Sequence, residues 1–116
     1  MRSTTTFDRG DIVYLPFEFS DRPVLRRRPA LVVSSTAYHQ SRHEVVVAAI
    51  TSRVRSPLFL GDYLLESWGE SGLERPSVVT AIIRTVRREM IERVVGRIPQ
   101  RDLAAFDANL RLALAL

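Results

Sequence analysis

Three consecutive arginines, Arg26 to Arg28, stand directly before Pro29 and the apolar run 30–33. Arginine presents a planar, permanently charged fork that matches two oxygens of a phosphate group. Proline fixes its own φ at about −65° and favours an extended backbone at the preceding residue. We therefore expect Arg28 to leave the end of a loop at a defined angle, where a rigid strand begins. A solvent-facing basic loop is the alternative interpretation of the three arginines.

A second polar cluster, Thr51-Ser52-Arg53, follows the apolar run 45–50, and Arg55 comes two residues later. The cluster places two hydroxyls and a cation at the end of a predicted strand. Ordinary turn chemistry also explains it, because serine and threonine bond to nearby backbone at strand ends.

Two histidines, His39 and His43, have the spacing that a zinc pair on one helical face would need. A third ligand is missing, because the chain has no cysteine and only Glu44 lies nearby. We therefore expect a solvated turn here, with no metal site and no cofactor.

The chain has 116 residues, of which 46% are apolar, and this suits a single domain over residues 1–116 with residues 1–6 flexible. No apolar run approaches the roughly 20 residues that a membrane helix needs, and no secretory signal is visible. The absence of cysteine excludes disulfides and makes a cytoplasmic protein the default. All 17 basic residues are arginine and the net charge is +4, which is consistent with a polyanionic partner or with genomic base composition.

The apolar residues alternate over several short segments and then change to a helical period after Pro99. Leu15, Phe17 and Phe19 share one face of the first segment, and Pro16 places that end at an edge or a bulge. The predicted strands are 11–19, 29–35, 44–50, 58–60, 63–65, 77–83 with 85–86, and 94–98. The terminal helix carries a stripe of Leu103, Phe106 and Leu110. This order predicts a mainly β fold with a C-terminal helix, in the form of a small, strongly curved barrel.

Several motifs occur together in a characteristic order. They are Gly10–Val13, Arg28–Ser34, Ala49–Ser52, Gly72–Val79 and the closing segment Val95–Ile98 before the helix. With this order and length, the chain from about Phe7 onward resembles the PemK/MazF family of toxins from bacterial type II toxin–antitoxin systems.

The resemblance implies an SH3-like barrel, a homodimer, and metal-independent, sequence-selective cleavage of single-stranded RNA that inhibits translation. It also implies an antitoxin, for which we expect an acidic, disordered tail. The family's functional arginine precedes the proline of the second strand, which is Arg28 here. Its functional threonine closes the third strand, which is Thr51 here. Ser77 matches a polar position near the same groove.

The chain departs from the family pattern at several positions. Better-known members have a glutamate where this chain has Pro23, and Asp21 is the nearest carboxylate that could replace it. Some members carry histidine in place of Arg27. Many have an acidic residue and a glutamine ahead of the Arg84-Thr85 pair, where this chain has the apolar segment 81–83. These differences bear on base preference and on proton transfer.

The chemistry of RNA cleavage fits these residues. RNA carries its own nucleophile, the 2′-OH, so a ribonuclease need only align it and stabilise the charge that develops on the phosphate. We expect Arg28 to stabilise that charge, with proton donation secondary, and Thr51 to donate a hydrogen bond to a phosphate oxygen. The residues expected to bind the flanking RNA are Asp21, Arg26, Arg27, Ser52, Arg53, Arg55 and Ser77.

Two alternatives remain open at the level of sequence. Toxins similar to CcdB use the same barrel to bind DNA gyrase without cleaving anything, and they need no Arg28–Thr51 pair. A catalytically lost RNA-binding barrel would retain RNA without fragmenting it.

Overall fold

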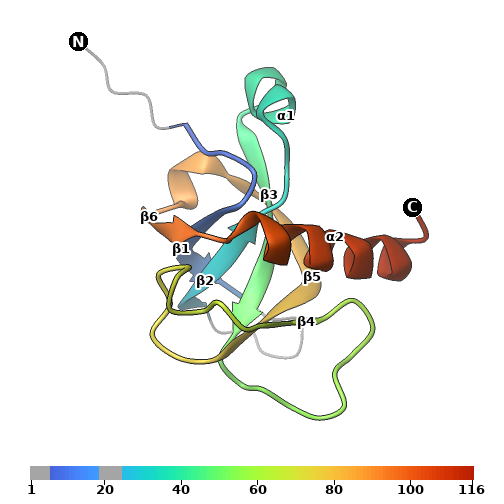
Figure 1. Cartoon of the computed structure of the whole chain (residues 1–116). Coiled ribbons are helices and arrows are strands. Elements are labelled where there is room, and N and C mark those ends of the chain that lie inside the picture. The colour runs from blue at the N-terminus through green and yellow to red at the C-terminus, as the bar shows by residue number, and fades with distance from the viewer. Residues whose placement is uncertain (1–5, 19–24) are drawn as a thin grey trace.

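The computed structural model describes residues 6–18 and 25–116 (Figure 1). Six antiparallel strands form one sheet in the order β4-β5-β3-β2-β1-β6. The strands are β1 (Asp11–Phe17), β2 (Arg26–Val32), β3 (Glu44–Thr51), β4 (Tyr63–Leu65), β5 (Ser77–Arg87) and β6 (Arg93–Arg97). The helices are α1 (Thr36–Ser41), the 3-10 turn η1 (Arg88–Met90) and α2 (Gln100–Leu114). The sheet curls on itself, as expected for a small barrel, and α2 lies across it (Figure 1).

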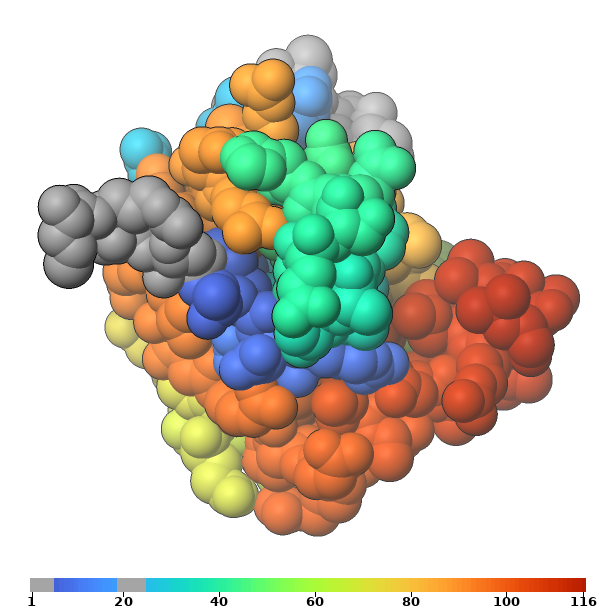
Figure 2. Space-filling view, turned by 90° about the horizontal axis from the view of Figure 1, so that it is seen from above, coloured from blue at the N-terminus to red at the C-terminus, as the bar shows by residue number. Residues whose placement is uncertain are grey.

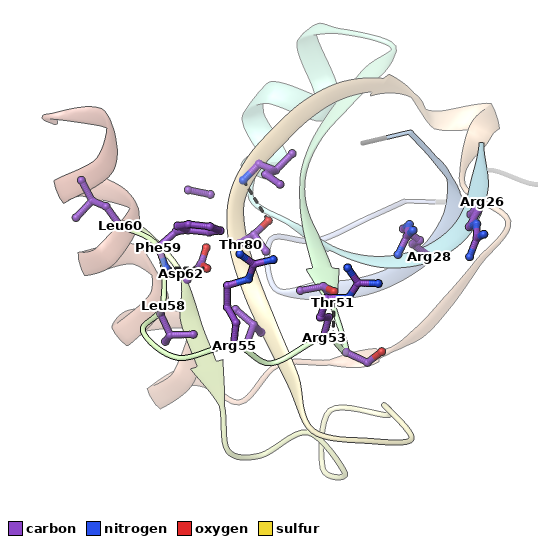
Figure 3. Close-up of a pocket in the computed structure, with 14 residues that line it drawn as sticks. Arg26, Arg28, Thr51, Arg53, Arg55, Leu58, Phe59, Leu60, Asp62 and Thr80 are labelled. Carbon is purple, nitrogen blue, oxygen red and sulfur yellow. Dashed lines mark hydrogen bonds between the residues drawn. The ribbon is translucent and has the colours of Figure 1, made fainter. Parts of the chain in front are cut away.

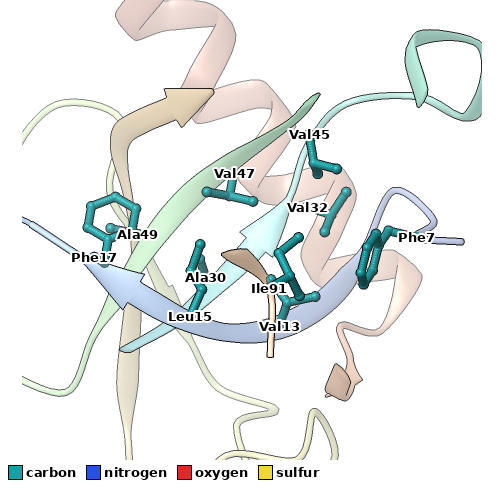
Figure 4. Packing of buried hydrophobic residues seen from close by; sticks show 10 residues of the cluster. All are labelled: Phe7, Val13, Leu15, Phe17, Ala30, Val32, Val45, Val47, Ala49 and Ile91. Atoms are coloured by element: carbon teal, nitrogen blue, oxygen red, sulfur yellow. The ribbon is translucent and has the colours of Figure 1, made fainter. Parts of the chain in front are cut away.

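The strand β3 and the second half of β2, from Ala30 to Val32, are buried on both faces, as their continuous apolar sequences predict. Odd-numbered residues of β3, such as Val47 and Ala49, enter one hydrophobic cluster, and even-numbered ones, such as Ala48 and Ile50, enter another. The first cluster fills the concave side of the sheet and includes Phe17 (Figure 4). Because side chains alternate along a strand, each position of β2 and β3 is committed to one of two faces.

The second cluster lies between the sheet and α2, whose side chains Leu103 and Phe106 are buried in it. These are the first residues of the predicted apolar stripe, and Leu110 packs against the same cluster. Toward its C-terminus the helix leaves the body of the protein, and its end projects to one side (Figure 2). Leu112 and Leu116 are accordingly exposed.

The loop 66–76 packs backbone to backbone against β6. A Cβ at Gly96 would lie 2.1 Å from the Ser71 carbonyl oxygen, and a Cβ at Gly72 would lie 2.6 Å from the Val95 carbonyl oxygen. Gly72 also has a φ of +91°, which favours glycine. Only glycine fits at these two positions, and this close contact holds the loop beside β6.

The structure corrects both predicted boundaries of the second strand. β2 begins at Arg26 and not at Pro29, because the arginines pair with β1 from Leu15 to Phe17 whatever their charge. It ends at Val32, and Ser35 accepts a hydrogen bond from the Tyr38 N–H to cap α1.

The segment 58–60 is not a strand, because it turns back at once through reciprocal hydrogen bonds between Phe59 and Asp62. The predicted segments 77–83 and 85–86 are one continuous strand, β5. β1 ends at Phe17, and Phe19 lies outside the described residues. Pro16 lies at an edge, as predicted, because the pairing of β1 with β6 stops at Tyr14. No helix in residues 6–18 and 25–116 is long and apolar enough to cross a membrane.

Candidate functional site

The register of the sheet places Arg28 and Thr51 across from each other. β2 and β3 pair from Val32↔Val47 to Ala30↔Ala49, and the ladder then stops beside Pro29, which has no N–H to donate. Continuing the register by two residues on each strand places Arg28 opposite Thr51. Because 28 and 30 share one face of β2, and 49 and 51 share one face of β3, both side chains extend the concave face beyond the first cluster.

These two residues line one groove of about 550 Å³, which we call the first groove (Figure 3). The groove runs from β2 past the end of β3 to the segment 58–62. Its lining is Arg26, Arg28, Thr51, Ser52, Arg53, Arg55, Leu58, Phe59, Leu60, Asp62, Val78, Thr80, Ala81 and Ile82. Four arginines therefore face one aspartate, and the groove suits an anion with apolar parts.

The Thr51 hydroxyl accepts a hydrogen bond that stabilises the turn, and its O–H can donate a second one. Its Oγ1 accepts a hydrogen bond from the Arg53 backbone N–H at 3.1 Å. This is the local turn chemistry expected of threonine at a strand end. A hydroxyl that accepts one bond still has its own O–H to donate. Thr51 is half-buried at the groove wall, so that donor can reach a ligand oxygen.

Arg27 points to the opposite face of β2 from Arg26 and Arg28. Its Nε lies 2.9 Å from Oε2 and 3.0 Å from Oε1 of Glu92. Arg27 lines a different hollow of about 480 Å³, which we call the second groove. Arg28 and Ser52 line both grooves, so the two meet where β2 and β3 separate.

The remaining predicted contacts divide into three cases. Arg53 and Arg55 are exposed in the first groove, beside Thr51. Ser77 lies at the second groove, but its side chain is buried and its hydroxyl donates to the Arg75 carbonyl at 2.9 Å. Asp21, proposed as a substitute for the family's glutamate, lies outside the described residues, as does Pro23.

His39 has a structural function and does not face His43 across a metal site. Its Nδ1 forms a hydrogen bond with the Phe7 carbonyl at 2.7 Å, and its Nε2 forms one with the Ser34 hydroxyl at 2.6 Å. The Ser34 oxygen in turn accepts the Val46 N–H at 2.9 Å. The histidine thus ties the N-terminal segment to α1 and β3. Among the described residues, no group of three His, Cys, Asp or Glu side chains could hold a metal ion.

Phe59 was not among the predicted site residues, and it is 61% exposed at the far end of the first groove. The Arg55 guanidinium lies 4.7 Å from the centroid of its ring, a cation–π contact. The sequence signal that could have indicated Phe59 is its position four residues after Arg55 in an irregular segment. The first groove is thus positively charged near β2 and β3 and apolar and aromatic at its other end.

Thr80 is a second residue that the sequence analysis missed, and it shapes the wall of the first groove. Ala48 pairs with Ile83 but Ile50 pairs with Val79, so β5 bulges opposite Ala49. The Thr80 hydroxyl donates to the Ala49 carbonyl at 2.8 Å and accepts the Ile82 N–H at 3.1 Å. This hydroxyl satisfies the backbone groups that the bulge would otherwise leave unpaired.

A family model described as PemK-like, MazF-like toxin of type II toxin–antitoxin system matches residues 8–114 of the chain. Among curated proteins, endoribonuclease MazF6 of Mycobacterium tuberculosis is 36% identical over 94 residues. The alignment covers 78% of this chain and 81% of that relative. Endoribonuclease MazF2 of Mycobacterium bovis matches to the same extent.

Solved structures share the fold over nearly the whole chain. MazF of Deinococcus radiodurans superposes with a TM-score of 0.73 at 26% identity, covering 97% of this chain and all of that one. An endoribonuclease in complex with its cognate antitoxin, from Mycobacterial species, superposes with a TM-score of 0.78. It is 18% identical and covers 96% of this chain and 97% of that chain, so it shows the fold alone.

Proposed function

This chain belongs to the PemK-like, MazF-like family of toxins from type II toxin–antitoxin systems, and from that premise we propose that it is an endoribonuclease acting on single-stranded RNA. The observation that carries the proposal is the first groove, where Arg28 and Thr51 face the same space from opposite strands. A 36% identical relative named as an endoribonuclease favours this function over a barrel that only binds its target.

In the proposed reaction the 2′-oxygen of the RNA attacks the adjacent phosphorus, and the bond from phosphorus to the 5′-oxygen breaks. The 2′-OH proton passes to solvent, and the departing 5′-oxygen takes up a proton. Arg28 stabilises the charge on the phosphate oxygens through its planar fork, and Thr51 holds one of those oxygens with its O–H. The products are a 2′,3′-cyclic phosphate and a 5′-OH. No step needs a metal ion or an activated water.

The arginines Arg26, Arg53 and Arg55, which line the first groove, bind RNA phosphates next to the cleaved one. Ser52, at the junction of the grooves, contributes a further hydroxyl. We propose no direct RNA contact for the Ser77 hydroxyl, because it is buried and already donates to the backbone. The proposed site of action is the cytoplasm, where messenger RNA is translated. The proposed assembly is a homodimer neutralised by an antitoxin that covers the same groove.

The test uses a matched pair of RNA oligonucleotides around one mapped cleavage site. The first is all-ribose, and the second carries a 2′-deoxy nucleotide directly 5′ of the cut. We expect the purified protein to cleave only the first, to do so in EDTA, and to leave a 2′,3′-cyclic phosphate and a 5′-OH by mass spectrometry. Both RNAs should bind equally, because their phosphates are the same. Cleavage of the deoxy substrate, or a 5′-phosphate on the product, would mean that water attacks.

A further inference from the structure

We propose that the second groove binds RNA nucleotides on the side of the cleaved phosphate opposite to those in the first groove. This inference rests on the proposed function. The two grooves meet at the point where β2 and β3 separate, beyond the pair Ala30↔Ala49. From there, alternate positions face opposite sides of the sheet: Arg26 toward the first groove, Arg27 toward the second. Arg28 and Ser52 line both.

The cleaved phosphate, held by Arg28 and Thr51, would therefore lie beside Ser52, at the boundary between the two grooves. The RNA chain continues from a phosphodiester in two directions, and a cleaved phosphate must have nucleotides on both sides. The first groove accepts one direction. The second groove is the hollow that adjoins the same phosphate position from the other face, and its volume is about 480 Å³. A nucleotide entering it would remain covalently continuous with the one in the first groove.

The far wall of the second groove is held in place by backbone contacts. The loop 66–76 supplies Glu74 and Arg75 to this wall. Its close approach to β6 depends on Gly72 and Gly96, where any Cβ would meet backbone atoms. Arg75 is therefore delivered by a fixed loop, and its guanidinium is exposed to the hollow.

The side chains of the second groove suit a nucleotide. The Arg93 guanidinium lies 4.9 Å from the centroid of the Tyr14 ring, on the strand pair β1–β6. Unpaired RNA bases stack on aromatic rings and on guanidinium planes of this kind. Within the described residues neither Arg75 nor Arg93 forms an ion pair with a carboxylate, whereas Arg27 is paired with Glu92. We therefore assign base stacking to Arg93 and a phosphate contact to Arg75.

An acidic protein segment is the competing occupant of this groove, and two observations favour RNA. Glu74 lies on the groove wall and would repel a run of carboxylates, while it can accept hydrogen bonds from base amino groups. The groove also adjoins Arg28 directly, so a substrate held there is positioned for cleavage. A protein segment would gain nothing from the second feature.

The experiment compares Arg93→Ala with wild type on RNAs shortened stepwise on the 5′ or the 3′ side of the cut. For the wild type, shortening either flank should raise KM, because each groove binds one of them. Arg93→Ala should raise KM for the long RNA by about tenfold, and it should make KM insensitive to shortening on one flank only, the flank that the second groove binds. Arg93→Lys should recover only part of the effect, because it keeps the charge without the plane. Arg75→Ala should act on the same flank and should reduce the salt dependence of KM, because one phosphate contact is lost.

The matched control is Arg87→Ala, which removes an exposed arginine at the end of β5, outside both grooves. It should leave KM and the dependence on both flanks unchanged. If Arg93→Ala and Arg75→Ala behave like this control, the second groove does not bind substrate. If they weaken binding of an acidic peptide and not of RNA, the groove belongs to a protein partner and the inference is overturned. A wild-type protein that cleaves no RNA would contradict the proposed function itself, which is a separate outcome.

Discussion

Arg28 is held in position by strand pairing and by its neighbour. It pairs with Leu15 of β1 on one side, and on the other side the sheet opens toward Thr51. Pro29 restricts the backbone after it. An arginine on a paired strand is held more firmly than an arginine at the end of a loop, which was the expectation from the sequence. Such preorganisation is what a group must have to stabilise a transition state without reorganising during the reaction.

The first prediction concerns Arg28. We expect Arg28→Ala to lower kcat by about 10²–10³-fold, the usual loss for one preorganised donor to a developing charge. Arg28→Lys should recover little, since an ammonium cannot bind two oxygens in one plane. Single-turnover cleavage of a fixed RNA measures the effect, and thermal unfolding verifies that each variant is folded. A folded Arg28→Ala protein with wild-type cleavage would exclude the assignment.

The second prediction concerns the Thr51 hydroxyl. Thr51→Ala should reduce cleavage less than Arg28→Ala does, by about tenfold, because one hydrogen bond to a charged oxygen is lost. Thr51→Ser retains the hydroxyl and should stay close to wild type. The two variants share the loss of the methyl group, so a serine variant as slow as the alanine variant would point to packing as the cause.

At the scale of elements, α2 is joined to β4 by a buried polar contact. The Tyr63 hydroxyl donates to Oδ1 of Asp102, which is 3% exposed in the first turn of the helix. Asp102 is not part of the apolar stripe of Leu103, Phe106 and Leu110, and yet it is buried. Burial, followed by the bond to Asp102, raises the pKa of Tyr63 from 10.0 to about 12.

The third prediction follows from that raised pKa. Between pH 10 and 12 the folded protein keeps the Tyr63 proton while the unfolded chain has released it, so the free energy of unfolding should fall as pH rises through this interval. The contribution is fully present below about pH 10. Tyr63→Phe should remove this part of the pH dependence and should destabilise the protein at pH 7 by about 1 kcal/mol.

Urea unfolding at a series of pH values from 8 to 11.5 measures both effects. Tyr38→Phe is the control, because Tyr38 lies on α1, away from Asp102. If the wild type and Tyr63→Phe lose stability equally over this range, the contact between β4 and α2 does not hold the proton as described.

At the scale of the whole molecule, apolar side chains remain exposed around the end of α2. Leu112, Leu114 and Leu116 are 69%, 43% and 85% exposed. Leu60, which precedes β4, and Leu64, within β4, are also exposed. The segment 60–64 and α2 are in close contact, since a Cβ at Gly61 would lie 2.9 Å from the Ala113 Cβ. Exposed apolar surface of this kind usually marks an interface.

The fourth prediction is a two-fold homodimer that includes part of this surface. Leu112→Glu should shift the protein toward monomer in sedimentation velocity at micromolar concentration, because the dimer would bury a carboxylate. Gln40→Glu, on the exposed side of α1, adds the same charge elsewhere and should leave the dimer intact. A wild-type protein that sediments as a monomer at that concentration would rule the dimer out.

The fifth prediction concerns the antitoxin. A segment that silences the first groove should imitate RNA charge and add apolar anchors, as the arginines and the exposed Phe59 at its far end require. Arg26→Gln should weaken antitoxin binding and reduce its salt dependence. Arg27→Gln should do so less, since Arg27 faces away from this groove and is already paired with Glu92. Isothermal titration at two salt concentrations tests this, and equal affinities for wild type and Arg26→Gln would place the acidic tail elsewhere.

The local patterns of the sequence were sufficient for much of the fold. Alternation predicted a strand over 11–19, of which the structure confirms 11–17. The continuous apolar run predicted the doubly buried strand at 44–50, and the change of period predicted the helix after Pro99, and the structure confirms both. Residue type and chain order also singled out Arg28 and Thr51, because the motifs around them depend on neighbours within a few positions. Such features are encoded where they occur, so one sequence can reveal them.

The tertiary structure decided the features that depend on contacts between distant parts of the chain. The pairing of β2 with β1 made the arginines part of a strand. The end of the pairing between β2 and β3 opened the gap at which the two grooves meet. Tyr14 and Arg93 meet only because β1 and β6 are neighbours in the sheet. Gly72 and Gly96 meet only because the loop closes over β6. No local pattern specifies these partners, since burial and backbone pairing across the whole sheet select them.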